Sequence, residues 1–222
     1  MEIVVDTFLV ECYTARMQMT PLKDRAILRG FAWRRRWLRT RLLDFPDAFR
    51  HTERLLICLP VDQEEARRAV RVVPELITCF QASATTVAGL PASAALCESI
   101  TSPVRVDTIS GDDRRWSGLP SSALVDRITG DGLNAAVDLN PDLDVMTAAL
   151  CLQSGAPLRM CFQGRSRDLF FNVQIAVSSE AQSDDANHTS AGSDASQTTP
   201  YTRLLNTIRG MMGKSAEGEL TR

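Results

Sequence analysis

Short apolar runs alternate with segments of helical spacing through the middle of the chain. The clearest runs are residues 54–60, 133–139 and 157–163, and each is bounded by polar or turn-forming residues. Runs of this length are typical of strands that are buried on both faces. We therefore predict strands at 54–60, 77–82, 103–109, 133–139 and 157–163, and a further strand that ends at 177.

Helical spacing and capping residues occupy the stretches between these runs. Asp62 is a candidate N-cap, and Glu64 and Glu65 follow it in the first turn, where the helix dipole favours acids. Pro74 should end this helix near residue 73. We predict helices at 62–73, 121–130 and 143–153, and a loop with a short helix at 83–100.

Strands that alternate with helices indicate βαβ units and a parallel sheet. The predicted fold class of residues 54–177 is therefore α/β: a single Rossmann-like domain with a mostly parallel sheet of about five to six strands and helices on both faces. The turn after the first strand reads PVDQEE, with three acids and no glycine. Because acids there would repel a phosphate, we expect no conventional nucleotide site in this turn and no cofactor.

The two flanks differ in charge. Residues 1–19 have no clear pattern, whereas 20–50 read as a basic amphipathic helix and linker, with eight bases and one acid between 21 and 41. The residues of this segment that we expect to contact a membrane or a partner are Trp33, Arg34, Arg35, Arg36 and Trp37. This helix could pack on its own domain, meet a protein partner or lie on an anionic membrane. Nucleic acid is disfavoured, because no recognised binding module follows the basic run.

The carboxyl-terminal flank combines an acidic segment with a second helix. Residues 178–199 contain four acids and no Lys, Arg, Leu, Ile, Val or aromatic side chain. This composition predicts a disordered Ser/Ala/Asp linker. Residues 200–213 then resume helical spacing. This second amphipathic helix could dock on its own sheet or fill the groove of a protein partner.

The remaining composition narrows the class of protein. The six cysteines form no CxxC pair and there are only two histidines, so we expect reduced thiols and no metal site. No segment reaches the roughly 18 apolar residues of a membrane span. Residues 1–19 also lack the features of a signal peptide. We therefore expect a cytoplasmic protein, with peripheral contact to the inner membrane as a further hypothesis.

Candidate site residues gather where the predicted strands end. Asp138, Asn140 and Asp142 follow one strand, and their side chains could bind sugar hydroxyls or supply a general base; equally, Asp142 could cap the next helix and Asp138 could make a turn hydrogen bond. Arg165 and Arg167 could hold a phosphate or carboxylate, or lie solvated in a basic loop. The further predictions are that Asp112, Asp113, Arg114 and Arg115 pair with one another, and that Trp116 packs on the sheet edge.

The run 121–177 resembles the amino-terminal half of bacterial lipopolysaccharide heptosyltransferases, a glycosyltransferase family. The matching segments are LVDRITGDGLNAAVDLN, CLQSGAP, LRMCF and RDLFFNVQI. The resemblance implies the acceptor-side half of a two-domain glycosyltransferase, whose second half binds the nucleotide sugar and is expected to be absent here. It also implies a catalytic Asp after a Gly in the first loop. Asp62 and Glu64 lie in that loop without the Gly, and Cys161 replaces the usual glycine after the LR strand.

Three functions remain open from the sequence. The preferred one is a non-catalytic, glycosyltransferase-like binding or scaffold module. The alternatives are an active glycosyltransferase completed by a partner chain, in which Asp62, Glu64 or Asp138 would be catalytic, and a docking subunit of a larger assembly. The oligomeric state is not indicated by the sequence.

Overall fold

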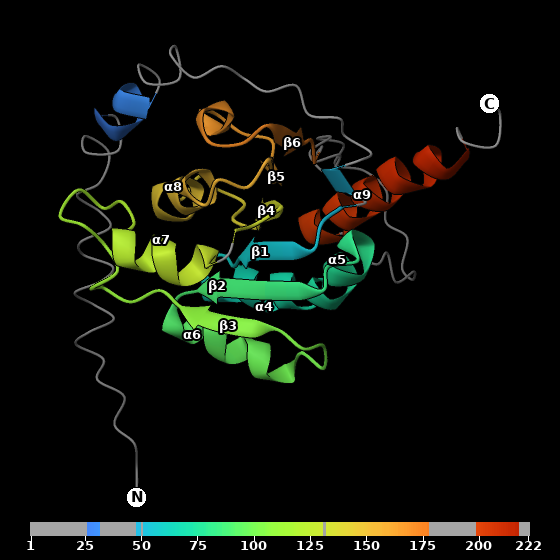
Figure 1. Cartoon of the computed structure of the whole chain (residues 1–222), viewed down its shortest axis with the longest axis horizontal. Coiled ribbons are helices and arrows are strands. Elements are labelled where there is room, and N and C mark those ends of the chain that lie inside the picture. The colour runs from blue at the N-terminus through green and yellow to red at the C-terminus, as the bar shows by residue number, and fades with distance from the viewer. Residues whose placement is uncertain (1–25, 32–47, 50, 131, 178–198, 218–222) are drawn as a thin grey trace, which may run out of the picture. The chain divides into compact units, whose positions relative to one another are not determined.

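The computed structural model describes residues 26–31, 48–49, 51–130, 132–177 and 199–217 (Figure 1). Residues 26–31 are helical. The predictions for residues 1–19, for most of the basic helix, and for the linker at 178–198 lie outside this described part. So do Trp33, Arg34, Arg35, Arg36 and Trp37, and their membrane or partner contacts therefore stay predictions.

Six parallel strands form one sheet in the order β3-β2-β1-β4-β5-β6, which confirms the predicted fold class. The chain starts at the centre of the sheet, builds one half outward to β3, and then returns to add the other half. This order is that of a Rossmann fold. The strands are β1 (Arg54–Cys58), β2 (Ala84–Gly89), β3 (Arg105–Thr108), β4 (Ala135–Asp138), β5 (Leu158–Phe162) and β6 (Val173–Ile175).

Helices and short turns connect the strands and continue the chain after the sheet. Their bounds are α4 (Gln63–Val70), α5 (Val73–Phe80), α6 (Pro91–Ala94), the 3-10 turn η1 (Ala95–Ser99), α7 (Ser122–Thr129), α8 (Val145–Gln153), the 3-10 turn η2 (Arg167–Leu169) and α9 (Pro200–Glu217). Three of them begin with a side-chain cap, from Asp62, Ser121 and Asp144 respectively. The prediction of Asp62 as an N-cap is confirmed, because its carboxylate accepts a hydrogen bond from Glu65 N at 2.9 Å.

The region between β1 and β3 corrects the sequence prediction. Residues 77–82 were expected to form a strand, but they belong to α5 and to the turn after it. Pro74 does not end one long helix; it lies in the first turn of a second helix, where its missing N–H has no bond to lose. The strand is instead formed by the small residues of β2, in the segment predicted as a loop with a short helix.

The register of the sheet assigns side chains to its two faces. Cys58, Ala88, Asp107, Asp138 and Cys161 are paired neighbours across the sheet and therefore share a face. That face meets α8, since Cys58 Sγ lies 3.7 Å from Cys151 Sγ. The alternate residues face a core formed with α4, α5 and α9.

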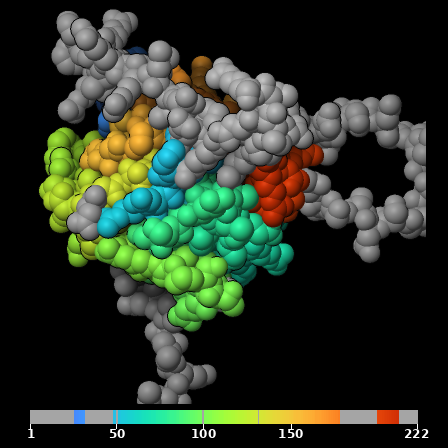
Figure 2. Space-filling model, turned by 45° about the vertical axis from the view of Figure 1, so that its right-hand side comes forward, coloured from blue at the N-terminus to red at the C-terminus, as the bar shows by residue number. Residues whose placement is uncertain are grey.

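Helix α9 completes the core that the sheet forms with α4 and α5 (Figure 2 shows α9 beside these two helices). Tyr201, Leu204, Leu205 and Ile208 are all buried in the core cluster. Tyr201 also donates a hydrogen bond through its hydroxyl to Glu65 Oε2 at 2.7 Å, which ties α9 to α4. The apolar stripe of α9 is thus used within its own domain.

Candidate functional site

The carboxyl ends of β1 and β4 mark the place where the strand order reverses. The chain runs outward from β1 toward β3 in one direction and from β4 toward β6 in the other. In open parallel sheets of this kind, ligands bind in the crevice at this reversal. The side chains that end β4 and follow it, from Asp138 to Thr147, therefore form the candidate site.

Asp138 lies at the bottom of the site with no exposed surface. Its Oδ1 accepts a hydrogen bond from Asn140 Nδ2 at 2.6 Å and another from Asn140 N at 3.2 Å. Thr147 Oγ1, from the first turn of α8, lies 3.3 Å from Asp138 Oδ2 and 3.4 Å from Oδ1. Asp138 is therefore enclosed by its own loop and by α8.

Asn140 closes the crevice between the two central strands. Its Oδ1 accepts a hydrogen bond from Val61 N at 2.9 Å, and its Nδ2 lies 3.4 Å from the carbonyl oxygen of Leu59. Both partners belong to the loop after β1, whereas Asn140 belongs to the loop after β4. One buried amide thus joins the two loops that would separate around a ligand in an open Rossmann site.

Arg167 lies under the same loop and is only 1% exposed. Its Nη2 donates hydrogen bonds to the carbonyl oxygens of Asn140 at 2.9 Å and Pro141 at 2.7 Å. Ser166 before it has a φ of 62°, in the left-handed region that serine seldom adopts. A Cβ on Gly164 would lie 2.8 Å from Arg167 Nε, so glycine leaves the space that the guanidinium occupies.

This position corrects the prediction of a solvated basic loop. Arg167 is a buried residue of the site, whereas Arg165 is exposed. Arg167 Nη1 is buried and has no hydrogen-bond partner among the described residues. Asp142 is exposed and does not cap the following helix; Asp144 does so, because its Oδ1 accepts a hydrogen bond from Thr147 N at 2.9 Å. The predicted cluster of four ligand residues is therefore divided between the interior and the surface.

Burial controls the ionisation of this site. Loss of solvation raises the pKa of Asp138 to about 7, although the hydrogen bonds from Asn140 and the charge of Arg167 act in the opposite direction. Burial also raises the pKa of Cys161 to about 12, against the influence of Arg167. The pKa of Cys151 is raised as well, by its hydrogen bond to Cys58 and by burial. Both thiols stay protonated at neutral pH and are poor nucleophiles.

Asp62, in the loop after β1, and Glu64 and Glu65, in the first turn of α4, all make structural contacts. Asp62 caps α4, Glu64 pairs with Arg67, and Glu65 contacts both Arg68 and Tyr201. Glu64 and Arg67 are half-exposed at the surface of the helix. The backbone amide of Glu65, which an anion at the start of α4 would need, already donates to Asp62.

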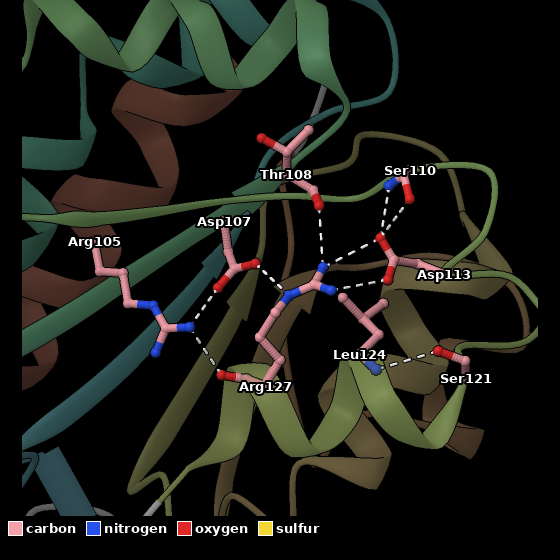
Figure 3. A network of polar contacts seen from close by, with 8 residues as sticks. All are labelled: Arg105, Asp107, Thr108, Ser110, Asp113, Ser121, Leu124 and Arg127. Atoms are coloured by element: carbon pink, nitrogen blue, oxygen red, sulfur yellow. Dashed lines mark hydrogen bonds and ion pairs between the residues drawn. The ribbon is translucent and has the colours of Figure 1, made fainter.

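A second polar network, which the sequence did not reveal, lies at the edge strand β3 (Figure 3). Arg127, from α7, donates hydrogen bonds to Asp107 Oδ1 at 2.8 Å and to both carboxylate oxygens of Asp113 at 3.0 and 3.1 Å. Arg105 also donates to Asp107, at 2.8 Å. The expected pairing of residues 112–115 with one another is thus wrong for Asp113, whose partner is 14 residues away.

This network holds the loop after β3. Burial acts to raise the pKa of Asp113, but hydrogen bonds from Arg127 and Ser110 outweigh it and bring the pKa below its ordinary value. Arg127 also donates to the carbonyl oxygen of Thr108, at the last residue of β3. Its guanidinium therefore joins α7, the end of the edge strand and the loop. The role of this network is structural.

Replacing Arg127 with alanine should lower the free energy of unfolding by about 1–3 kcal/mol, because Asp107 and Asp113 would remain buried without their shared partner. Urea denaturation measures this loss, and hydrogen exchange should become faster at residues 110–120. Arg67→Ala is the matched control: its exposed pair with Glu64 should contribute less than about 0.5 kcal/mol. Equal losses in the two variants would contradict the assigned role of Arg127.

Within the described ranges there is no group of three or more His, Cys, Asp or Glu side chains that could hold a metal ion. None of the described helices has the length and hydropathy that crossing a membrane requires. At the ends of β1 and β4, the side chains of Asp138 and Asn140 are hydrogen-bonded within the chain, whereas Arg167 Nη1 has no partner among the described residues.

No protein-family model matches the chain, and no curated protein matches it. Among solved structures, the heptosyltransferase WaaC of E. coli, determined with ADP, is similar with a TM-score of 0.43 and 11% sequence identity. The similarity covers 58% of this chain and 42% of the WaaC chain, so this chain spans less than half of that enzyme. The fold assignment rests on the observed strand order and register.

Proposed function

We propose that this chain is a non-catalytic binding or scaffold module that uses the Rossmann-like fold of a glycosyltransferase half without its chemistry. One observation carries the proposal: the crevice between β1 and β4 is closed by the chain itself, through the hydrogen bonds of Asn140 with Val61 N and with Asp138. A nucleotide or sugar at this place would have to break both bonds and leave buried polar groups without partners.

The candidate catalytic groups support the same proposal. A general base must reach its substrate within about 3 Å. Asp138 has no exposed surface, and its carboxylate is enclosed by Asn140 and Thr147. Asp62 is exposed, but it caps α4 and has no neighbouring glycine to admit a phosphate.

An activity assay tests this proposal. We would incubate the full chain with ADP- and UDP-linked sugars and measure the release of nucleoside diphosphate. The expected rate equals the uncatalysed rate for the wild type and equally for Asp62→Asn and Asp138→Asn. Release by the wild type that disappears in either variant would contradict the proposal, because it would identify that carboxylate as a base that activates water, the only acceptor present, for attack on the nucleotide sugar.

A further inference from the structure

Trp116 is 93% exposed, which corrects the prediction that it packs on the sheet edge. It lies at the tip of a small hairpin formed by residues 114–120, here called the tip hairpin, in which Arg114 and Pro120 form an antiparallel bridge. Arg115 N donates to the carbonyl oxygen of Leu119, and Gly118 N donates to that of Arg115, each at 2.8 Å. Gly118 has a φ of 87°, which only glycine adopts without strain and which closes the turn.

The tip hairpin is held firmly at its base. Asp113 accepts hydrogen bonds from Ser110 N at 2.8 Å and from Ser110 Oγ at 2.9 Å, in addition to those from Arg127. Ser121 N, on the other side of the hairpin, donates to the carbonyl oxygen of Asp113 at 2.7 Å. An exposed indole on a loop that is already ordered loses little conformational entropy when it is buried by a partner.

A groove of about 550 Å³ begins at the same strand end. It runs beside β3, along α6 and η1, and Thr108 and Glu98 are among its lining residues. Its apolar lining residues include Pro91, Ala94, Cys97, Ile100, Val104 and Val106, although the exposed surface of its wall is polar and apolar in about equal parts. Val106 is 41% exposed although it lies in a strand, so the groove leaves apolar surface in contact with water.

We propose that Trp116 of one copy of this chain inserts into the β3 groove of a second copy, and that the two copies form a two-fold symmetric dimer. The chain carries both parts: an exposed indole on the tip hairpin, and a groove beside β3 whose wall includes apolar residues. A two-fold interface uses the same surface on both subunits. Each copy therefore inserts its Trp116 into the groove of the other copy.

Charge complementarity supports a second copy as the occupant. Arg115, next to Trp116, is exposed, and Glu98 is an exposed residue of the groove wall. In the dimer, Arg115 of one copy meets Glu98 of the other while the indole fills the apolar part of the groove. Tryptophan and arginine are also the side chains most enriched among residues that dominate binding energy.

Sedimentation velocity of the full chain over a wide concentration range tests the dimer. The wild type should change from monomer to dimer as its concentration rises. Trp116→Ala should raise the dissociation constant by about thirtyfold or more. Because Trp116 is exposed, the variant should keep the wild-type stability to urea. Met211→Ala, at an exposed position of α9, is the matched control and should dimerise like the wild type.

A charge exchange tests the geometry. Arg115→Glu and Glu98→Arg should each weaken the dimer, and the double variant should recover most of the lost affinity, because the pair is restored with its charges reversed. A wild type that stays monomeric at every concentration would overturn the proposal. So would a dimer that is unaffected by Trp116→Ala, or a double variant no stronger than the two single ones.

Discussion

Replacing Asp138 with asparagine should remove a loss of stability that the wild-type protein undergoes between about pH 4 and pH 7. The folded-state pKa of Asp138 is about 7, against an ordinary value of 3.8. Between these values the folded state binds the proton more tightly than the unfolded state. The stabilisation from the neutral carboxyl is therefore complete below about pH 4 and is lost as the pH rises through 7.

The size of this effect follows from the pKa difference. At about 1.4 kcal/mol per unit, it reaches about 4 kcal/mol above pH 7. Asparagine resembles the neutral acid: its oxygen can accept from Asn140 Nδ2, and its NH₂ group can donate to Thr147 Oγ1. Asp138→Asn should therefore match the wild type near pH 4 and be more stable above pH 7.

Urea denaturation of the two proteins at a series of pH values measures the difference. Asp142→Asn is the matched control, because Asp142 belongs to the same loop but is exposed. Its stability should follow that of the wild type at every pH. A difference between Asp138→Asn and the wild type that stays constant from pH 4 to pH 8 would show that Asp138 does not titrate in this range.

Leu204→Ala should lower the free energy of unfolding by about 3 kcal/mol, within a range of roughly 2–5 kcal/mol. Leu204 is fully buried in the core that α9 forms with the sheet, α4 and α5. The substitution removes buried apolar surface and leaves a cavity that its neighbours fill only in part.

The urea midpoint of Leu204→Ala, compared with that of Met211→Ala, separates packing from helix propensity. Met211 lies on the same helix but is 36% exposed, and its replacement should change the unfolding free energy by less than about 0.5 kcal/mol. If Leu204→Ala were as stable as Met211→Ala, α9 would not be part of the folded core.

The half of the fold around β4, α8 and β5 could be predicted because its signals are local. Buried apolar runs define the two strands, and the turn at 154–155 separates the helix from β5. The half containing α5 and β2 could not. The apolar run at 77–82 is too short to distinguish a strand from a buried helix. In β2, small residues are required by packing: a Cβ on Gly89 would lie 3.2 Å from Leu59 Cβ.

The position of the candidate site could be predicted from the sequence, but the burial and hydrogen bonding of its side chains could not. The position of Asp138 and Asn140 at the end of a central strand follows from the topology alone. The burial of Arg167 depends on Ser166 adopting a rare backbone conformation and on two distant carbonyl groups. The Arg127 network likewise joins residues 14 and 20 positions apart, and no local pattern indicates such contacts.

These contacts give one physical account of the molecule. A Rossmann fold ordinarily leaves polar groups at its strand reversal for a ligand to satisfy. Here Asn140 satisfies Val61 N and Asp138, while Asp62 satisfies the start of α4. Since an added ligand would have to replace these bonds rather than complete them, binding there gains little.

The most direct test of this account is a calorimetric titration of the full chain with ADP and with ADP- and UDP-linked sugars. We expect only heats of dilution, because the crevice between β1 and β4 is closed. A saturable heat with one-to-one stoichiometry that is lost in Asn140→Ala would contradict the account, since it would place a nucleotide at the closed crevice.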